Sequence, residues 1–277
     1  MSKPRIVTII QARMASSRLP GKVMKEIDDK AMLMQVVDRA SLSKLVDAVG
    51  VATTTDPSDD PIEGLCRANG CLVYRGSMFD VLDRFYRASQ AFEADVIVRL
   101  TADCPLIDVE VLDRTISTFL DSDVDFAANR LPPPWKRTYP IGLDTEVCSF
   151  AGLERTWNEA AQPYQREHVM PYFYDWTTPG GLIGRQEGRF RIQILDYEVD
   201  YGSLRWTVDT PQDLEVVRQI FIHFSGRQYF GWLEVLDLIQ NHPELRLINV
   251  DVHHKTGFDV DDRNLLDVRI GGRKNPG

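Results

Sequence analysis

The sequence of 277 residues carries a formal net charge of −9, and 43% of its residues are hydrophobic. This size suits one large domain or one domain with an appendage, and the acidity argues against nucleic-acid binding, which usually needs a basic face. No hydrophobic run approaches the roughly 20 residues that span a bilayer, and we expect no signal peptide. The four cysteines have no metal-binding spacing, so we expect buried thiols in a cytoplasmic protein with no membrane contact.

The first half of the chain alternates strand and helix patterns. Predicted strands cover 6–11, 48–53, 71–74, 95–100 and 124–128, and predicted helices cover 32–42, 60–70, 79–91 and 109–119. The acidic cluster at 56–60 is interpreted as a solvated turn. Alternation of this kind predicts an α/β fold with a doubly wound parallel sheet, in which ligands bind at the carboxyl ends of the strands.

The second half is less regular. A proline-rich stretch at 131–142 predicts a long ordered loop, which is either a lid or a rigid surface excursion. Further strands are expected at 145–149, 192–197 and 204–208, and helices at 151–160, 163–174, 211–224 and 232–241. We expect a single domain over 1–254, followed by a polar tail at 255–277 that is loose at its end.

A cluster of cations follows the first predicted strand. Arg13, Arg18 and Lys22 fall within ten residues, together with serine, proline and glycine residues that free backbone N–H groups. Such a loop suits the phosphates of a nucleoside triphosphate, although a solvated basic loop would have the same composition. It is not the common P-loop, because Lys22 is followed by Val23 rather than by serine or threonine.

This segment, QARMASSRLPGKVM, resembles the signature of the cytidylyltransferases of bacterial surface-polysaccharide synthesis. These SpsF-type proteins are similar to the CMP-ketodeoxyoctonate and CMP-sialate synthetases. The resemblance continues through RLTADCPLID at 99–108, GLDTEV at 142–147, REHVMPY at 166–172 and WTVDTPQDL at 206–214. It implies a three-layer α/β/α sandwich of the nucleotidyltransferase type, shared with A-type glycosyltransferases.

Two aspartates each follow a predicted strand. Asp103 comes after the strand at 95–100 and Asp209 after the strand at 204–208. By spacing alone Asp103 is a turn residue and Asp209 a helix N-cap. The resemblance implies that both are ligands of Mg²⁺, which prefers a few carboxylates together with phosphate oxygens and water. Ala102 stands where the family often has glycine.

The resemblance further implies nucleotidyl transfer, in which an acceptor oxygen attacks the α-phosphorus of CTP and pyrophosphate leaves. We expect Arg13 and Lys22 to bind the phosphates and Arg18 to shape the loop or neutralise the pyrophosphate. The part of the site that binds the base is less defined. Arg84 is the candidate for contacting the base or ribose, with Arg75 as the second candidate. Alternatively, Arg84 pairs with Asp80 one helical turn earlier. The predicted nucleotide-binding residues are Gln11, Ala12, Arg13, Arg18, Lys22, Thr53, Arg75 and Arg84.

Four residues are candidates for binding the acceptor. Asp144 and Glu146 alternate with apolar residues and share one face of a strand, where they bind sugar hydroxyls or face water. Arg166 and His168 belong to a polar trio, in which His168 contacts the acceptor, transfers a proton, or serves as a structural hydrogen-bonding group.

Two other functions compete with cytidylyl transfer. A glycosyltransferase of this fold usually holds its metal with a DxD pair, but Thr101 and Pro105 stand two residues either side of Asp103. A non-catalytic nucleotide-binding protein would have less need of four intact site residues, Arg13, Lys22, Asp103 and Asp209. The sequence fixes neither the base by direct readout nor the sugar-like acceptor. A homodimer is expected because related synthetases are commonly dimeric.

Overall fold

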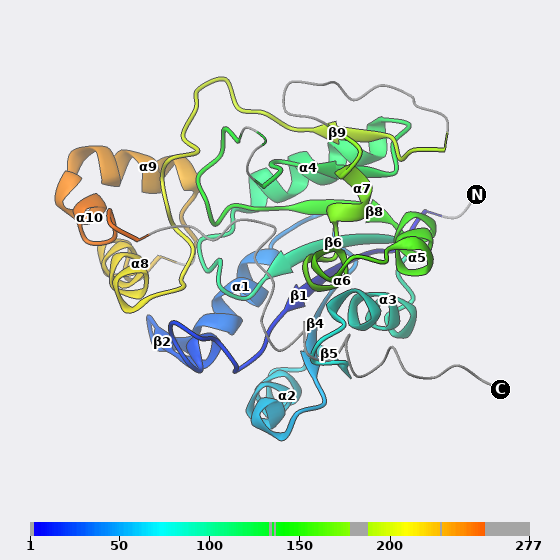
Figure 1. The fold of residues 1–277 in the computed structure, drawn as a ribbon. Helices are drawn as coiled ribbons and strands as arrows, with labels where there is room; N and C mark the ends of the chain where they lie inside the picture. The colour runs from blue at the N-terminus through cyan, green and yellow to red at the C-terminus, as the bar shows by residue number, and fades with distance from the viewer. Residues whose placement is uncertain (1–2, 133–134, 136, 178–187, 228, 253–277) are drawn as a thin grey trace.

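A seven-stranded sheet forms the centre of the computed structural model, which describes residues 3–132, 135, 137–177, 188–227 and 229–252. The strand order is β5-β4-β1-β6-β8-β7-β9, and β8 runs antiparallel to both of its neighbours while the other pairs are parallel (Figure 1). The strands are β1 Ile6–Gln11, β4 Ala48–Thr54, β5 Leu72–Gly76, β6 Val96–Thr101, β7 Phe126–Ala128, β8 Glu146–Ser149 and β9 Ile192–Ile194.

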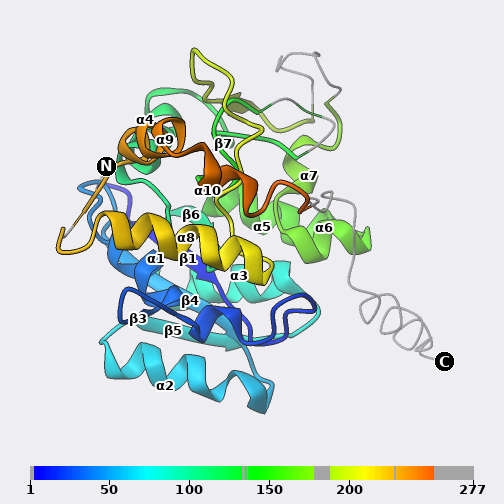
Figure 2. The ribbon, with the colours of Figure 1, turned by 90° about the vertical axis from the view of Figure 1, so that its left-hand side faces the viewer.

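Helices cover both faces of this sheet. Side chains alternate along a strand, so the two faces of β1 contribute to two hydrophobic clusters. Ile6 and Ile10 pack in one cluster with α1, α4, α8 and α9. Val7 and Ile9 pack in the other with α3, α5 and α7. The α-helices are α1 Met32–Ala40, α2 Asp60–Ala68, α3 Val81–Ala91, α4 Val109–Asp121, α5 Phe150–Glu159, α6 Pro163–His168, α7 Pro171–Tyr174, α8 Pro211–His223, α9 Trp232–Asn241 and α10 Pro243–Leu247. Figures 1 and 2 show α8, α9 and α10 grouped at one side of the molecule. The predicted three-layer α/β/α sandwich is confirmed.

The order of the strands creates a switch point beside β1. From β1 the chain adds β4 and then β5 on one side, and afterwards returns to place β6 on the other side of β1. The loops that follow β1 and β6 therefore diverge, and such a divergence at the carboxyl ends of parallel strands is where doubly wound sheets bind ligands.

The helix predicted at 163–174 is two short helices. Val169 lies between α6 and α7 with φ 71°, a conformation that β-branched residues rarely adopt. Pro171 opens α7 and has no N–H group to continue the hydrogen-bond ladder of α6. The prediction of one continuous helix is therefore wrong.

The strand predicted at 204–208 does not join the sheet. Its segment pairs with the single residue Ile141, which donates to Leu204 and accepts from Trp206. Gly142 follows at φ 110°, and a Cβ there would lie 2.8 Å from the backbone of Trp206 and Thr207. This turn carries the chain away and ends the pairing after one bridge.

The second half of the chain is described only in part. Phe230 and Trp232 are buried in the core. The tail at 255–277 lies outside the described residues, as do residues 133, 134 and 136 of the proline-rich loop. That the tail is loose and that the loop at 131–142 is either a lid or a rigid excursion therefore stay predictions. In the described part of the chain, no helix is long and apolar enough to cross a membrane.

Candidate active site

The loop from Ala12 to Gly21 follows β1 and is held at both of its ends. The Ala12 amide donates to the Ala52 carbonyl at the end of β4 (3.2 Å), and the Gly21 amide closes the loop by donating to the Met14 carbonyl (2.9 Å). Gly21 has φ 66°, the left-handed conformation that glycine adopts freely. The turn then places Lys22 at the start of the 3₁₀ helix η1, Lys22–Met24, beside the carboxyl end of the sheet.

Asp59 anchors this loop to β4. It is 1% exposed and accepts hydrogen bonds from the Met14 amide (2.7 Å) and from Thr53 and Thr54. Its place in the acidic cluster at 56–60 predicted a solvated turn, which is wrong for this residue, because the preceding 3₁₀ turn directs its side chain inward. The local sequence gives no signal that distinguishes Asp59 from its acidic neighbours Asp56 and Asp60.

Asp103 and Asp209 converge on one point, although 105 residues separate them in sequence. The Lys22 ammonium donates to Asp103 Oδ2 (2.7 Å), to Asp209 Oδ1 (2.9 Å) and to the Val208 carbonyl (2.8 Å). The Asp103 carbonyl accepts from the Val208 amide (2.8 Å), which fastens the two segments together. A cation thus already lies between two carboxylates at the switch point.

Asp209 is not the cap of α8. Thr210 is the N-cap, and its side chain and that of Asp213 form a reciprocal capping box. The Asp209 carboxylate is therefore available for other contacts, and its Oδ2 meets Arg18 Nη2 (2.9 Å) and Arg205 Nη2 (2.8 Å). Sequence analysis missed Arg205, which lies four residues before Asp209 and is also ion-paired with Asp213.

The charges of this group stabilise one another. Burial opposes the ammonium of Lys22, but Asp103 and Asp209 outweigh it and raise the pKa of Lys22. Burial likewise opposes the carboxylate of Asp209, yet Lys22 and Arg205 hold the pKa of that carboxyl below its usual range. Both groups are consequently charged at neutral pH.

The residues predicted to face the base have structural partners. Thr53 is buried against Asp59. Arg75 donates to the Thr54 carbonyl and pairs with Asp60 and Glu63, so its guanidinium braces the connection between β4 and α2. Gln11 accepts from Arg99 at the end of β1 (3.2 Å).

Arg84 is a buried cation beneath the loop. Its side chain is 0% exposed, so it presents no surface to a nucleotide in this state. One nitrogen donates to the Ser77 carbonyl, while Nε and Nη2 have no hydrogen-bond partner among the described residues. Burial and the nearby charge of Arg13 lower the pKa of Arg84 to about 10. The alternative pairing with Asp80 is not formed, since Asp80 is bound by Arg166 instead.

The predicted acceptor acids both lie among arginines, Glu146 buried and Asp144 half-buried. Glu146 pairs with Arg99 of the neighbouring strand β6. Asp144 pairs with Arg130 (3.2 Å) and Arg137 (3.3 Å), so two guanidinium groups share one carboxylate. The nitrogens that face Asp144 in these ion pairs are the buried Arg130 Nε and Arg137 Nη1. This cluster, hereafter the arginine pair, had no counterpart in the sequence analysis.

The arginine pair lies near the aspartates. Burial and the charges of both Asp103 and Asp144 raise the pKa of the Cys104 thiol, so both carboxylates act on the same side chain. Arg166, in contrast, joins α6 to the N-cap of α3 through Asp80 and donates to the Trp157 carbonyl. His168 is the last residue of α6 and half-buried.

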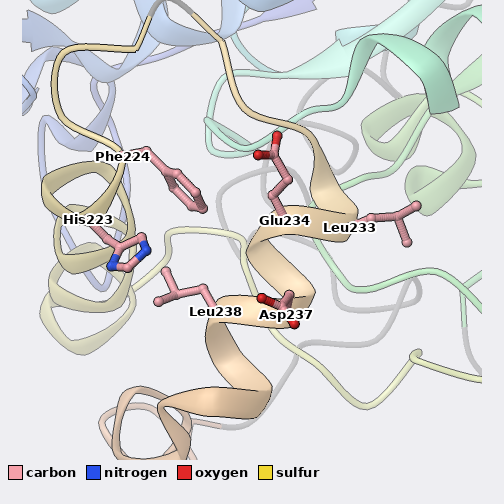
Figure 3. Close-up of a pocket in the computed structure, with 6 residues that line it drawn as sticks. All are labelled: His223, Phe224, Leu233, Glu234, Asp237 and Leu238. Carbon is pink, nitrogen blue, oxygen red and sulfur yellow. The ribbon is translucent and has the colours of Figure 1, made fainter.

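A pocket of about 350 Å³ lies elsewhere, between the end of α8 and α9. Figure 3 shows His223 and Phe224 of the α8 end facing Leu238 of α9. The 13 residues of α8 separate this pocket from Asp209 by about 20 Å at 1.5 Å per residue. It is not part of the site at the switch point.

Comparison with known proteins identifies the family. The model of a family described as cytidylyltransferase matches residues 7–221. The chain belongs to the cytidylyltransferase family. This makes it a nucleotidyltransferase, and the glycosyltransferase and non-catalytic alternatives lose their support.

Individual relatives agree with this assignment. The cytidylyltransferase is 33% identical over 260 residues to an uncharacterised protein of Methanocaldococcus jannaschii, covering 93% of this chain and 100% of that protein. It is 30% identical to the spore coat polysaccharide biosynthesis protein SpsF of Bacillus subtilis (86% and 95% covered). It is also 28% identical to the 3-deoxy-manno-octulosonate cytidylyltransferase of Solibacter usitatus (78% and 94%).

A solved structure extends the likeness to three dimensions. The structure of a cytidylyltransferase from Leptospira borgpetersenii superposes with a TM-score of 0.80 at 31% identity, covering 91% of this chain and 100% of that one. The fold and the family therefore agree.

Proposed function

We propose that this enzyme transfers CMP from CTP to a hydroxyl group of an acidic sugar, with Mg²⁺, in the synthesis of a surface polysaccharide or glycan. The observation that carries the proposal is the convergence of Asp103 and Asp209 on one cation position beside the loop of Arg13, Arg18 and Lys22. Phosphoryl-type transfer depends mainly on positioning and on neutralising charge, and this arrangement offers both.

The donor set fits a magnesium ion. Two carboxylate oxygens approach one cationic nitrogen at 2.7 and 2.9 Å, so a single ion can lie between them. No group of three or more His, Cys, Asp or Glu side chains is gathered for a metal among the described residues. The protein would thus supply two carboxylates and leave the other positions to phosphate oxygens and water, as Mg²⁺ prefers.

The chain's own groups have distinct tasks in this proposal. Arg13, Arg18 and Lys22 bind the phosphates and neutralise the leaving pyrophosphate. The bound metal would draw charge from the α-phosphate. The acceptor oxygen then attacks the α-phosphorus in line, and no protein nucleophile is needed.

The arginine pair supports an acidic acceptor. Arg130 and Arg137 carry two positive charges against the one negative charge of Asp144. Two guanidinium groups with an excess of one positive charge favour an anionic ligand with two oxygens, such as a carboxylate. The printed name of the Solibacter relative, a cytidylyltransferase for a sugar acid, agrees with such an acceptor. In this proposal Asp144 orients the two guanidiniums, and His168 remains a candidate acceptor contact.

Pyrophosphate release tests the proposal. The enzyme is incubated with Mg²⁺, one of CTP, UTP, GTP or ATP, and a panel of sugar acids with their neutral, reduced counterparts. Release should require CTP and an acid, and it should fall on the order of 100-fold or more in Asp103→Asn and Asp209→Asn. Release that survives both substitutions contradicts the metal assignment, and equal use of neutral sugars contradicts the acidic acceptor.

Two properties of the whole protein are also proposed. A homodimer is expected, and light scattering after gel filtration measures it directly. A cytoplasmic location agrees with the four cysteines, which are all free thiols in the structure. Mass analysis of thiols alkylated before lysis would reveal disulfides if the protein were exported.

A further inference from the structure

All three N–H donors of the Lys22 ammonium are used inside the protein. They reach one oxygen of Asp103, one oxygen of Asp209 and the Val208 carbonyl, at 2.7 to 2.9 Å. An ammonium group has only three donors. In this state Lys22 therefore cannot bind a phosphate, and its nitrogen fills the position at which the two carboxylates converge.

The two sides of the site cannot both act without a rearrangement. Asp103 and Asp209 can share a divalent cation only if the ammonium leaves, because like charges repel strongly at such distances. Lys22 can bind phosphate only if it gives up the carboxylates. One movement of this side chain serves both requirements.

The surroundings single out Lys22 as the group that moves. Arg205 is fixed on Asp209 Oδ2 by its second ion pair with Asp213, which leaves Asp209 Oδ1 facing Lys22. Lysine carries a compact charge on a flexible four-carbon stem. It lies directly after Gly21, where the loop turns.

We propose that Lys22 is the resident counter-ion of the aspartate pair and excludes free divalent cations from it. A triphosphate draws the ammonium onto its own oxygens, and the carboxylates then accept the metal that arrives with the nucleotide. Each anion keeps a cation beside it throughout the exchange, and the aspartate pair gains the second positive charge of the divalent metal. Lys22 is thereby a specificity-determining residue, because the site accepts the metal–nucleotide complex and rejects the free metal. The identity of that nucleotide and metal rests on the proposed function.

Binding of free Mn²⁺ without nucleotide tests this inference. Unbound Mn²⁺ is counted by electron paramagnetic resonance for wild type, Lys22→Gln and the matched control Lys25→Gln, which removes the same charge three residues away. Lys22→Gln should bind Mn²⁺ on the order of tenfold or more tightly than the other two, the effect of removing one adjacent like charge. Equal affinity in all three proteins, or tight binding by wild type, overturns the inference.

Two further measurements locate the effect. The double variant Lys22→Gln/Asp209→Asn should lose the gained affinity, and a gain that persists there would mean that the metal binds elsewhere. If Lys22→Gln is unfolded without metal, Mn²⁺ should restore its folded state by replacing the missing cation, and failure to do so also overturns the inference.

The outcome is separable from that of the proposed function. Absence of CTP-dependent pyrophosphate release contradicts the function but leaves the Mn²⁺ comparison informative about Lys22. Normal turnover with equal Mn²⁺ affinity in the three proteins contradicts the inference alone.

Discussion

Replacing Arg84 with methionine separates the stability of the fold from nucleotide binding. Arg84 is fully buried, and two of its nitrogens have no hydrogen-bond partner in the described structure. Methionine keeps most of the aliphatic packing and removes the charge. We expect a protein that is no less stable than wild type. We also expect it to bind CTP less tightly, because the charge of Arg84 lies close to Arg13 and adds to the positive potential of the loop proposed to bind the phosphates.

The magnitude follows from two opposing terms. Burial and the charge of Arg13 lower the pKa of Arg84 from its ordinary value to about 10, so the fold disfavours this cation by about 3 kcal/mol at 1.36 kcal/mol per pKa unit. Because the pKa is lower in the folded state, this penalty is fully present below about pH 10 and disappears as the pH rises further. Losing the bond to the Ser77 carbonyl removes about 1.5–3 kcal/mol. The net change in the free energy of unfolding should therefore lie between about 0 and +1.5 kcal/mol.

Arg39 provides a matched control. It is also a buried arginine, but its Nε donates to the Ile107 carbonyl (2.7 Å) and its Nη2 to the Phe230 carbonyl (2.8 Å). Arg39→Met loses two satisfied charge-assisted bonds, about 3–6 kcal/mol together. Relief of the burial that lowers the pKa of Arg39 offsets part of this, so the variant should be destabilised by about 2–4 kcal/mol. At about 2–4 °C per kcal/mol for a domain of this size class, its Tm should fall by at least about 4 °C.

Thermal unfolding with and without CTP and Mg²⁺ measures both effects. Arg84→Met should melt at or slightly above the wild-type temperature and bind CTP roughly tenfold more weakly, which corresponds to about 1.4 kcal/mol. Arg39→Met should melt early and keep its CTP affinity. If Arg84→Met melts as early as Arg39→Met, or keeps wild-type CTP affinity, then Arg84 is an ordinary structural arginine and the reasoning fails.

Three other predictions concern the supports of the site. Asp59→Asn weakens the hydrogen bond that anchors the Met14 amide, so the KM for CTP should rise roughly tenfold with a smaller change in kcat. A tenfold rise corresponds to a loss of about 1.4 kcal/mol of binding free energy. A tenfold fall of kcat at unchanged KM would contradict this prediction. Gly142 has φ 110°, and a Cβ there would lie 2.8 Å from the Thr207 amide nitrogen. Gly142→Ala should therefore lower the free energy of unfolding, measured in urea, by about 1–3 kcal/mol. An unchanged midpoint of the urea transition would show that the turn relaxes. The difference in the free energy of unfolding between wild type and Asp209→Asn should be constant above about pH 4 and shrink below it, because the folded-state pKa of Asp209 lies below its unfolded value near 3.9. Urea melts at several pH values measure this difference. A difference that widens in acid would contradict the prediction.

Local patterns determined the elements of this protein. The continuous hydrophobic run of β1 and the apolar spacing of α9 predicted both elements with their observed bounds, because burial on a sheet or on one helical face repeats along the sequence. The alternation of such elements was sufficient for the sandwich, since a parallel sheet needs helical crossovers on its faces. The motif around Arg13 and Lys22 was sufficient for the family.

Tertiary structure alone decided which groups meet. Asp209 is available to a cation because Thr210, rather than Asp209, is the N-cap of α8. No local sequence pattern distinguished these two roles of Asp209. The burial of Asp59, the unsatisfied nitrogens of Arg84 and the arginine pair around Asp144 arise where separate strands end side by side. Hydrophobic periodicity is a property of neighbours in sequence, whereas the charge around a side chain depends on neighbours in space, and only the folded chain brings Lys22, Asp103 and Asp209 to one point.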